Sequence, residues 1–290
     1  MNKNKSTWKF SNDEKEKIVQ LWKNGCSTMT ISRMFGCNDE PIRELIIRRV
    51  PIDEYKRIVK KHMKRFEERK RIKKIRRPEL TKDLAWWVGV VKGDGNVNSK
   101  NGFIRLGVRE REFRDKWASV GRLLFGIEPK VRDFIKDKKP FYQAQFNSIK
   151  LVEYLKENFG FFGRYIWNIP NKVKSNKPDI LFGFLRGLFD SEGSMKFYGR
   201  ERGTVISLVS VRKECIFEIK TLLKKFNIKS RIKPYKRKDR KNTYYILYIG
   251  GFDNISKFAK NINFSISRKN NKLSSYLNYI TFGVDEFDAN

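Results

Sequence analysis

Two segments about a hundred residues apart follow one pattern, and this duplication constrains the fold more than any other feature of the chain. The first segment is LAWWVGVVKGDG, residues 84–95, and the second is FGFLRGLFDSEG, residues 182–193. Each is a short apolar stretch that ends in an acidic residue followed by glycine. Asp94 and Glu192 occupy equivalent positions. The duplication predicts two half-sites that meet at a pseudo-twofold axis, with one carboxylate from each.

Small residues recur at every fourth position of both segments, a spacing that lets two helix backbones approach closely. These positions are Ala85, Gly89 and Gly93 in the first segment and Gly183, Gly187 and Ser191 in the second. We expect the two helices to pack along these stripes, which would place Asp94 and Glu192 side by side. Carboxylates at helix C-termini oppose the helix dipole and repel each other, and a divalent cation would reverse both effects. Oxygen ligands with free coordination positions suit Mg²⁺. The predicted metal site comprises Asp94, Glu192 and the residues before them, Gly93 and Ser191.

The rest of the chain after residue 81 also reads as a repeat, because Val108-Arg109 matches Val211-Arg212. Helices are predicted over 112–125 and 150–158 in the first copy and over 214–226 and 254–262 in the second. Strands are predicted over 129–136 and 141–147, matched by 230–237 and 243–250. The predicted fold class is α+β, with one αββαββα repeat over 81–178 and another over 179–290.

Alternation along the predicted strands gives each copy a sheet with an apolar back and a basic, amide-rich front. Arginine and glutamine can make bidentate contacts with guanine and adenine in the major groove. The last strand of the second copy, TYYILYI, is apolar on both sides and fits this pattern less well. The residues predicted to contact DNA are Arg105, Lys130, Arg132, Lys136, Gln143, Gln145 and Asn147 in the first copy and Arg231, Lys233, Tyr235 and Arg237 in the second.

The formal net charge of +33 indicates a polyanionic partner, for which nucleic acid is favoured over an anionic membrane surface. No run approaches the roughly 20 apolar residues of a membrane span, and the first residues lack the apolar core of a signal peptide. We therefore expect an intracellular protein, located in the cytoplasm, at the nucleoid or in an organelle.

The chain has one histidine, which excludes Ser-His and Cys-His triads and nucleases with a histidine base. The three cysteines have no paired spacing, so no zinc site of the usual Cys/His kind is expected. Catalysis must then depend on carboxylates, lysines, arginines and a metal ion.

Residues 1–52 are predicted to form a small helical unit similar to a helix-turn-helix DNA-binding domain. Its helices are expected from Ser11 or Asn12 to about Lys23, from 28 to 35, and after the capping residue Asn38. A plain three-helix unit is the alternative, since Asp39 and Glu40 at the start of the third helix would repel phosphates. Residues 53–80 are predicted to be a basic helical linker, because 56–77 contain thirteen Lys or Arg.

The acid-ending segments, and especially IPNKVKSNKPDILFGFLRGLFDSEGSM at residues 169–195, resemble the LAGLIDADG family of homing endonucleases in its single-chain, two-motif form. The resemblance covers about 81–280. It implies sheets that form a saddle over the major groove, a monomer bound to a long specific site in double-stranded DNA, and Mg²⁺-dependent cleavage that leaves short 3′ overhangs. The metal acids carry over to Asp94 and Glu192. The resemblance also implies basic residues where the first long strand of each repeat ends. These positions hold Arg109 and Arg212, and Lys196 and Lys213 are alternatives for the same role.

Two other functions remain open on the same fold. An RNA maturase that assists intron splicing could retain both acids, and its partner would be intron RNA. A non-cleaving DNA-binding regulator is less favoured, because both acids are present. An intein is not expected, since the chain starts at Met1 without a splicing Cys or Ser and has a single histidine.

Overall fold

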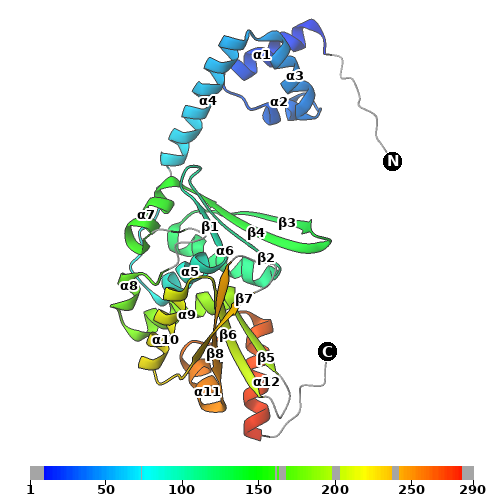
Figure 1. The fold of residues 1–290 in the computed structure, drawn as a ribbon. Helices are drawn as coiled ribbons and strands as arrows, with labels where there is room; N and C mark the ends of the chain where they lie inside the picture. The colour runs from blue at the N-terminus through cyan, green and yellow to red at the C-terminus, as the bar shows by residue number, and fades with distance from the viewer. Residues whose placement is uncertain are drawn as a thin grey trace. The chain divides into compact units, whose positions relative to one another are not determined.

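The fold was taken from a computed structural model, which describes residues 10–72, 74–160, 162, 168–197, 203–236 and 242–282 (Figure 1). The chain divides into two compact units, Met1–Ile72 and Lys73–Asn290. Among the described helices, none is long and apolar enough to cross a membrane.

The described residues of the first unit form four helices: α1 (Asn12–Lys23), α2 (Thr28–Met34), α3 (Asp39–Arg49) and α4 (Ile52–Ile72). Ser11 begins α1 with a capping box, in which its hydroxyl accepts from the Glu14 amide and the Glu14 carboxylate accepts from the Ser11 amide. A small core of its own holds the unit together, formed by Ile18, Trp22, Ile31, Ile42, Ile46, Val50 and Ile58. The predicted basic linker is therefore helical through residue 72, and its start packs on the three shorter helices.

The second unit confirms the predicted α+β fold with two αββαββα repeats. The first repeat contains α5 (Lys82–Gly93), β1 (Gly95–Asn98), β2 (Phe103–Val108), α6 (Arg111–Phe125), β3 (Lys130–Lys136), β4 (Lys139–Asn147) and α7 (Ile149–Phe159). Its antiparallel sheet has the order β1-β2-β4-β3.

The second repeat contains α9 (Pro178–Glu192), β5 (Gly193–Phe197), β6 (Thr204–Ser210), α10 (Lys213–Lys225), β7 (Arg231–Lys236), β8 (Thr243–Gly250) and α11 (Phe252–Asn261). Its sheet has the matching order β5-β6-β8-β7. The short helix α8 (Asn171–Lys174) precedes it, and α12 (Ser267–Phe282), which the repeat pattern does not predict, follows it.

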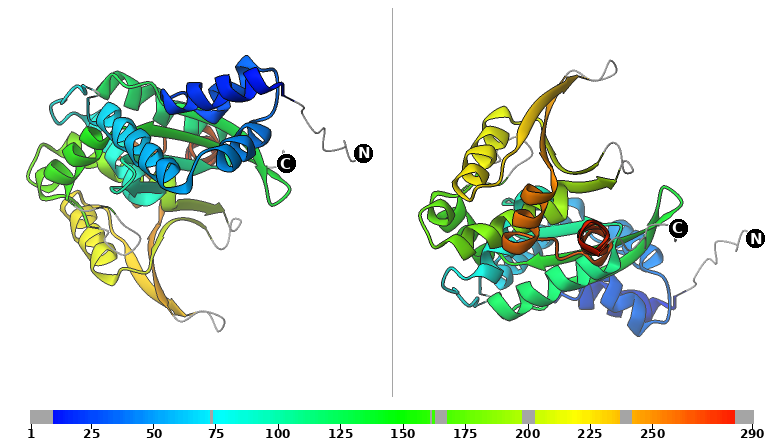
Figure 2. Two further views of the ribbon diagram at one scale, coloured as in Figure 1. Left: turned by 90° about the horizontal axis from the view of Figure 1, so that it is seen from above. Right: turned by 90° about the horizontal axis from the view of Figure 1, so that it is seen from below.

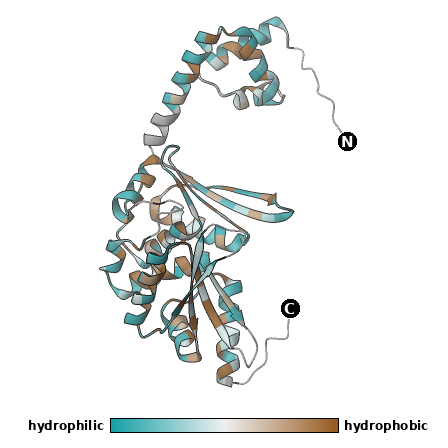
Figure 3. Ribbon diagram, in the orientation of Figure 1, coloured by the Kyte–Doolittle hydropathy of each residue, from teal (hydrophilic) through white to brown (hydrophobic). Residues whose placement is uncertain are grey.

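One hydrophobic core runs through both repeats, because α5 and α9 pack on each other between the two sheets. Helices α6 and α7 contact the first sheet, and α10 and α11 contact the second (Figure 2). The indoles of Trp87 and Trp117 stack with their ring centroids 4.8 Å apart. Apolar residues gather in the helices at the centre of this unit, whereas β3 and β4 are largely polar (Figure 3). Every side chain of β3 is exposed to solvent.

Candidate metal centre and nucleic-acid interface

The two acid-ending helices, α5 and α9, touch backbone to backbone along the predicted small-residue stripes. A Cβ atom at Gly187 would lie 2.2 Å from the carbonyl oxygen of Trp86, and one at Gly89 would lie 2.3 Å from that of Phe184. Distances this short leave no space for a side chain, so glycine is required at both positions. Near the helix ends, a Cβ at Gly93 would lie 2.5 Å from the Cβ of Ser191. The contact therefore continues to the residues just before the two acids.

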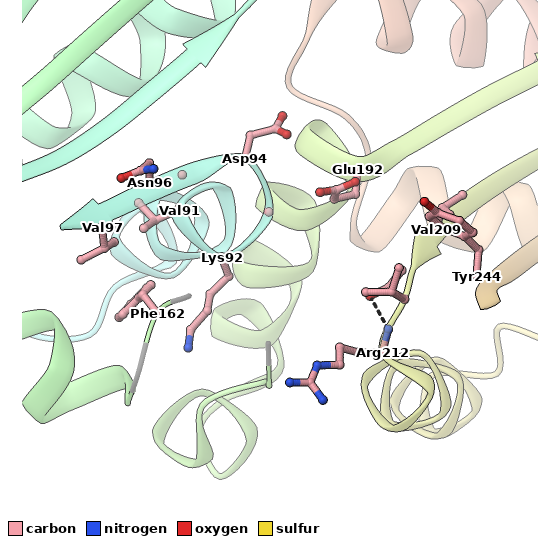
Figure 4. Close-up of a pocket in the computed structure, with 14 residues that line it drawn as sticks. Val91, Lys92, Asp94, Asn96, Val97, Phe162, Glu192, Val209, Arg212 and Tyr244 are labelled. Atoms are coloured by element: carbon pink, nitrogen blue, oxygen red, sulfur yellow. Dashed lines mark hydrogen bonds between the residues drawn. The ribbon is translucent and has the colours of Figure 1, made fainter. Parts of the chain in front are cut away.

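This contact brings the two carboxylates to one pocket. Asp94 is the C-cap of α5, and Glu192 is the last residue of α9. Both line a single pocket together with Gly93, and their side chains are open to solvent (Figure 4). Ser191 does not line it, because its hydroxyl donates to the carbonyl oxygen of Gly187, 3.1 Å away inside the helix contact. Ser191 can therefore offer the pocket only its backbone carbonyl.

The charges of the two acids are poorly compensated. The pocket walls desolvate the carboxyl of Glu192, and repulsion from Asp94 adds to this effect, so its pKa rises to about 7. Desolvation likewise raises the pKa of Asp94, with a further contribution from Glu110, while Lys269 lowers it. Neither carboxylate accepts a hydrogen bond from any residue in the described parts of the chain.

The donor set of the pocket fits a divalent cation with oxygen ligands. Two adjacent carboxylates supply negative charge, and no third Asp, Glu, His or Cys joins them within the described residues. Most coordination positions would then be left to water and to a ligand phosphate, which is the arrangement that Mg²⁺ prefers. Such an ion would neutralise the repulsion between Asp94 and Glu192, which Lys269 offsets only in part.

One family model matches part of the second repeat, and several known proteins are similar to part of this chain. Residues 179–263 match the family model of the LAGLIDADG-like domain. The chain is similar to the replication factor C small subunit of Methanocaldococcus jannaschii, with 27% identity over 67% of this chain and 10% of that protein. It is also similar to a probable translation initiation factor IF-2 of the same organism, with 32% identity over 68% of this chain and 16% of that protein. The chain thus spans less than a fifth of the length of these relatives.

Among solved structures, variants of the homing endonuclease I-DmoI match with a TM-score of 0.47 and 14% identity, covering 62% of this chain and 95% of that one. Full-length DUF199/WhiA from Thermatoga maritima matches with a TM-score of 0.47 and 17% identity, covering 70% of this chain and 62% of that one. I-DmoI itself has been solved in complex with DNA and Mn and with DNA and Ca.

Two basic side chains share the pocket with the acids. Lys92, which precedes Gly93, points away from the carboxylates and lies over the ring of Phe162, 4.2 Å from its centroid (Figure 4). Burial lowers the pKa of Lys92 to about 8. Arg212 lines the pocket from the end of β6, and its buried Nε has no hydrogen-bond partner among the described residues. An unpaired guanidinium nitrogen in a pocket that also holds a lysine favours an anionic ligand such as phosphate.

The other predicted basic residues of the site lie apart from this pocket. The guanidinium of Arg109 donates to the carbonyl oxygens of Lys136, Lys139 and Pro140 at 2.8, 3.0 and 3.1 Å, so it holds the β3–β4 turn. Lys196 lies on β5, where it pairs with Val205 on the exposed face of the second sheet. Sequence symmetry had made Arg109 and Arg212 equivalent, whereas only Arg212 lines the pocket.

The sequence analysis did not predict a group of hydrogen-bonded residues that contacts the C-terminal end of α9. Lys269, on α12, donates to the last carbonyl oxygens of α9, those of Phe189 and Asp190. The buried carboxylate of Asp190 accepts from the Trp86 indole at 2.8 Å and from the amide and hydroxyl of Ser265. These bonds fix the last turn of α9 and therefore the position of Glu192. No pattern in the sequence links α12 to this helix.

The front face of the first sheet carries the predicted hydrogen-bonding residues. Cross-strand register places Arg105 opposite Gln145, Lys130 opposite Gln145, and Arg132 opposite Gln143. Their neighbours on the same face include Asn147, opposite Phe103, and Lys136, opposite Lys139. The back of the sheet holds the fully buried Ile104, Leu106, Ala144 and Phe146. The predicted division into a polar front and an apolar back is thus present in this sheet.

The second sheet differs from that expectation. Arg231, Lys233 and Tyr235 share one face, but only on the edge strand β7. Opposite them on β8 lie Tyr248, Ile246 and Tyr244, so the centre of the face is aromatic and aliphatic rather than basic and amide-rich. The back has the fully buried Leu247 and Ile249. Arg237 falls outside the described residues.

The raised pKa of Glu192 makes stability without metal depend on pH. Its ordinary pKa is 4.5 and its folded pKa is about 7, so the folded state holds this proton more tightly and loses stability as pH rises between these values. Because the side chain is solvent-exposed, the effect is expected to be about 1 kcal/mol or less. At pH 8 without metal, Glu192→Gln should therefore melt about 2–4 °C higher than wild type, whereas Mg²⁺ should stabilise only the wild type. Melting curves at pH 5 and 8 with and without Mg²⁺ test this, and identical shifts in both proteins would contradict it.

Proposed function

We propose that the protein is a site-specific endonuclease that cleaves both strands of DNA with a divalent metal held by Asp94 and Glu192. One observation carries the proposal: equivalent acids of two repeats end two helices in contact and share a pocket without hydrogen-bond partners among the described residues. Lys269 offsets only part of the charge of this pair, and a divalent metal ion bound by both carboxylates would neutralise the rest. The basic front of the first sheet and the basic edge strand β7 of the second would supply the adjoining nucleic-acid interface.

In this mechanism the protein positions the scissile phosphates and concentrates positive charge around them. Arg212 lies in the same pocket as the acids and would bind phosphate oxygens. Bound Mg²⁺ would lower the pKa of a coordinated water and stabilise the leaving oxygen. Asp94 and Glu192 would hold the ion, and the bonds from Lys269 to carbonyl oxygens near the end of α9 keep Glu192 in place. Lys130, Arg132 and Lys136 of the first sheet and Arg231 and Lys233 of the second would bind the DNA on either side.

The kinds of protein that contain a similar segment also support an endonuclease that belongs to a mobile genetic element. The similar segment makes up only 10–18% of three proteins with unrelated names: a replication factor, an aminotransferase and a translation initiation factor. One type of domain that recurs inside proteins of different function behaves as an element that moves independently of its host. Such an element needs cleavage of a specific sequence, which a passive regulator does not provide.

A selection on DNA would test the proposal directly. Wild-type protein is incubated with Mg²⁺ and a large randomised duplex library together with host genomic DNA, beside the Glu192→Gln variant, and new ends are sequenced. The proposal predicts discrete double-strand ends with a fixed 3′ overhang that the variant does not produce. Tight binding without any cut ends would instead favour a regulator, and selective binding of structured intron RNA would favour a maturase.

Binding should depend steeply on salt, because many phosphates would be neutralised by the basic sheets. A protein that makes six to ten phosphate contacts loses about a thousandfold or more in affinity between about 50 and 200 mM salt. We expect a loss of at least a hundredfold over this range, measured as equilibrium binding to the selected target. A nearly flat plot of log affinity against log salt would contradict the proposed interface.

The first unit is expected to add affinity rather than catalysis. We propose that it is a second DNA-binding unit joined to the endonuclease, so its removal should weaken binding about ten- to a hundredfold through lost effective concentration. The cut belongs at residue 72, because Ile75 and Leu80 pack against the core of the second unit and the Arg76 amide bonds to the carbonyl of Phe125. Cleavage of prebound target should change less than threefold. Slower cleavage of prebound target with unchanged DNA affinity would contradict this role for the first unit.

A further inference from the structure

The hydrogen-bonding groups on the first sheet are held in position before any ligand arrives. The Nε of Arg105 donates to the side-chain oxygen of Gln145 at 2.9 Å, and the amide of Gln145 donates to Asn147 at 2.7 Å. The guanidinium of Arg105 also stacks over the ring of Phe103, 4.6 Å from its centroid. The two terminal nitrogens of this guanidinium have no hydrogen-bond partner among the described residues. Such a fixed fork matches the O6 and N7 acceptors of guanine.

The corresponding face of the second sheet offers few groups of this kind. Its central strands present Val205, Ser207 and Val209 from β6, opposite Gly250, Tyr248 and Ile246 from β8. The hydroxyl of Ser207 already bonds to that of Ser194 at 2.9 Å. Val205, Val209, Ile246 and Tyr248 are only half-buried, although they are apolar over most of their surface. The positive charge is confined to the β7 edge, where Arg231 stacks on Tyr248 with 5.6 Å from its Cζ to the ring centroid.

The geometry points to two half-sites that are recognised by different chemistry. The first repeat reads purine edges through hydrogen bonds from Arg105 and its neighbours. The second repeat reads thymine through contact between its 5-methyl groups and the apolar centre formed by Val209 and Ile246, while Arg231 and Lys233 bind phosphates. This inference rests on the proposed function, and it specifies what each half of the target must contain.

The physical reason is the donor and acceptor pattern of the major groove. Guanine is distinguished there by two acceptors, which a fixed arginine fork satisfies together. Thymine is distinguished by its methyl group, which an aliphatic surface desolvates favourably. A surface without free donors would leave the N7 and O6 atoms of guanine unpaired, so the apolar centre also selects against guanine.

Base analogues in the selected target test the two halves separately. Deoxyuridine in place of thymine removes only the methyl group, and 7-deazaguanine in place of guanine removes only the N7 acceptor. In the half-site bound by the second repeat, we expect about fourfold weaker binding for each buried thymine methyl removed and little effect of 7-deazaguanine. In the half-site bound by the first repeat, we expect about tenfold weaker binding when a contacted guanine lacks N7 and little effect of deoxyuridine.

Two variants assign the halves to the repeats. Val209→Thr keeps the shape of the side chain but replaces one methyl group with a hydroxyl. It should reduce the effect of deoxyuridine in the half-site of the second repeat and leave the half-site of the first repeat unchanged. Arg105→Ala should remove the effect of 7-deazaguanine in the half-site bound by the first repeat. Lys233→Ala serves as the control for the second sheet, because loss of a phosphate contact weakens binding equally for every sequence and every analogue.

The outcomes separate this inference from the proposed function. Equal sensitivity of both halves to both analogues would overturn the inference while leaving a sequence-specific protein. A half-site assigned to the second repeat that contains no contacted thymine would overturn it as well. A library without any enriched sequence would overturn the proposed function, and this inference with it.

Discussion

Glu192→Gln is expected to slow Mg²⁺-dependent cleavage of the selected target about a thousandfold or more while DNA affinity changes little. Glutamine preserves the size of the side chain but removes the charge that would hold the cation. Asp94→Asn should have the same effect, since the two acids lie at equivalent helix ends and share one pocket. Single-turnover cleavage rates at saturating protein isolate this step, and equilibrium binding in Ca²⁺ measures affinity separately.

A matched control removes the same charge elsewhere on the second unit. Glu128 is exposed, and its carboxylate makes only a 3.5 Å ion pair with Arg122, so Glu128→Gln should cleave at the wild-type rate. Wild-type cleavage by either acid variant would contradict the metal assignment. Loss of binding together with cleavage, accompanied by a lower melting temperature, would mean that the acids stabilise the fold instead.

The contact between the two duplicated helices could be predicted because its small-residue spacing is visible in the sequence. Small residues every fourth position indicate a helix surface without side chains, and two such surfaces have only each other to contact. The structure places Gly187 against the carbonyl of Trp86 and Gly89 against that of Phe184. The positions of Asp94 and Glu192 at the adjacent ends follow from that contact and from their place in each repeat.

Residues that act from outside the repeat could not be predicted in this way. Lys269 lies on α12, which has no counterpart in the first repeat, and its bonds to α9 depend on a fold-level contact. Symmetry also fails for Arg109 and Arg212. The β3–β4 turn supplies three carbonyl oxygens to the guanidinium of Arg109, whereas the residues that follow β7 lie outside the described part of the chain.

The face of the second sheet shows the limit of period-two patterns. Alternation indicates which residues of a strand share a face. A strand such as TYYILYI has apolar residues on both faces, so its sequence does not indicate which face packs against the helices. The structure buries Leu247 and Ile249 under the helices and leaves Ile246 and Tyr248 half-exposed. That choice is made by the register with β6 and β7, which brings Arg231 and Lys233 to the same side.

Gly187→Ala is expected to give the largest loss of stability of any glycine-to-alanine change among the described residues of this unit. The new Cβ would lie 2.2 Å from the carbonyl oxygen of Trp86 and 2.8 Å from the backbone nitrogen of Val90, and neither backbone atom can rotate away. Helix propensity favours alanine over glycine by about 1 kcal/mol, so any loss measured is a net effect. Separation of the helices should still cost about 3 kcal/mol or more, which corresponds to a melting temperature about 6–12 °C lower.

The same substitution should reduce cleavage even at temperatures where the protein stays folded, because it separates the two helix ends that carry Asp94 and Glu192. A displacement of about 1 Å at a catalytic site costs roughly a hundredfold in rate. Gly250→Ala is the matched control, since its Cβ would meet no atom closer than 3.8 Å and the backbone there has an ordinary φ. We expect that variant to melt within about 1 °C of wild type. A Gly187→Ala protein with wild-type stability and activity would show that α5 and α9 do not meet backbone to backbone, and the shared carboxylate pocket would then lose its structural basis.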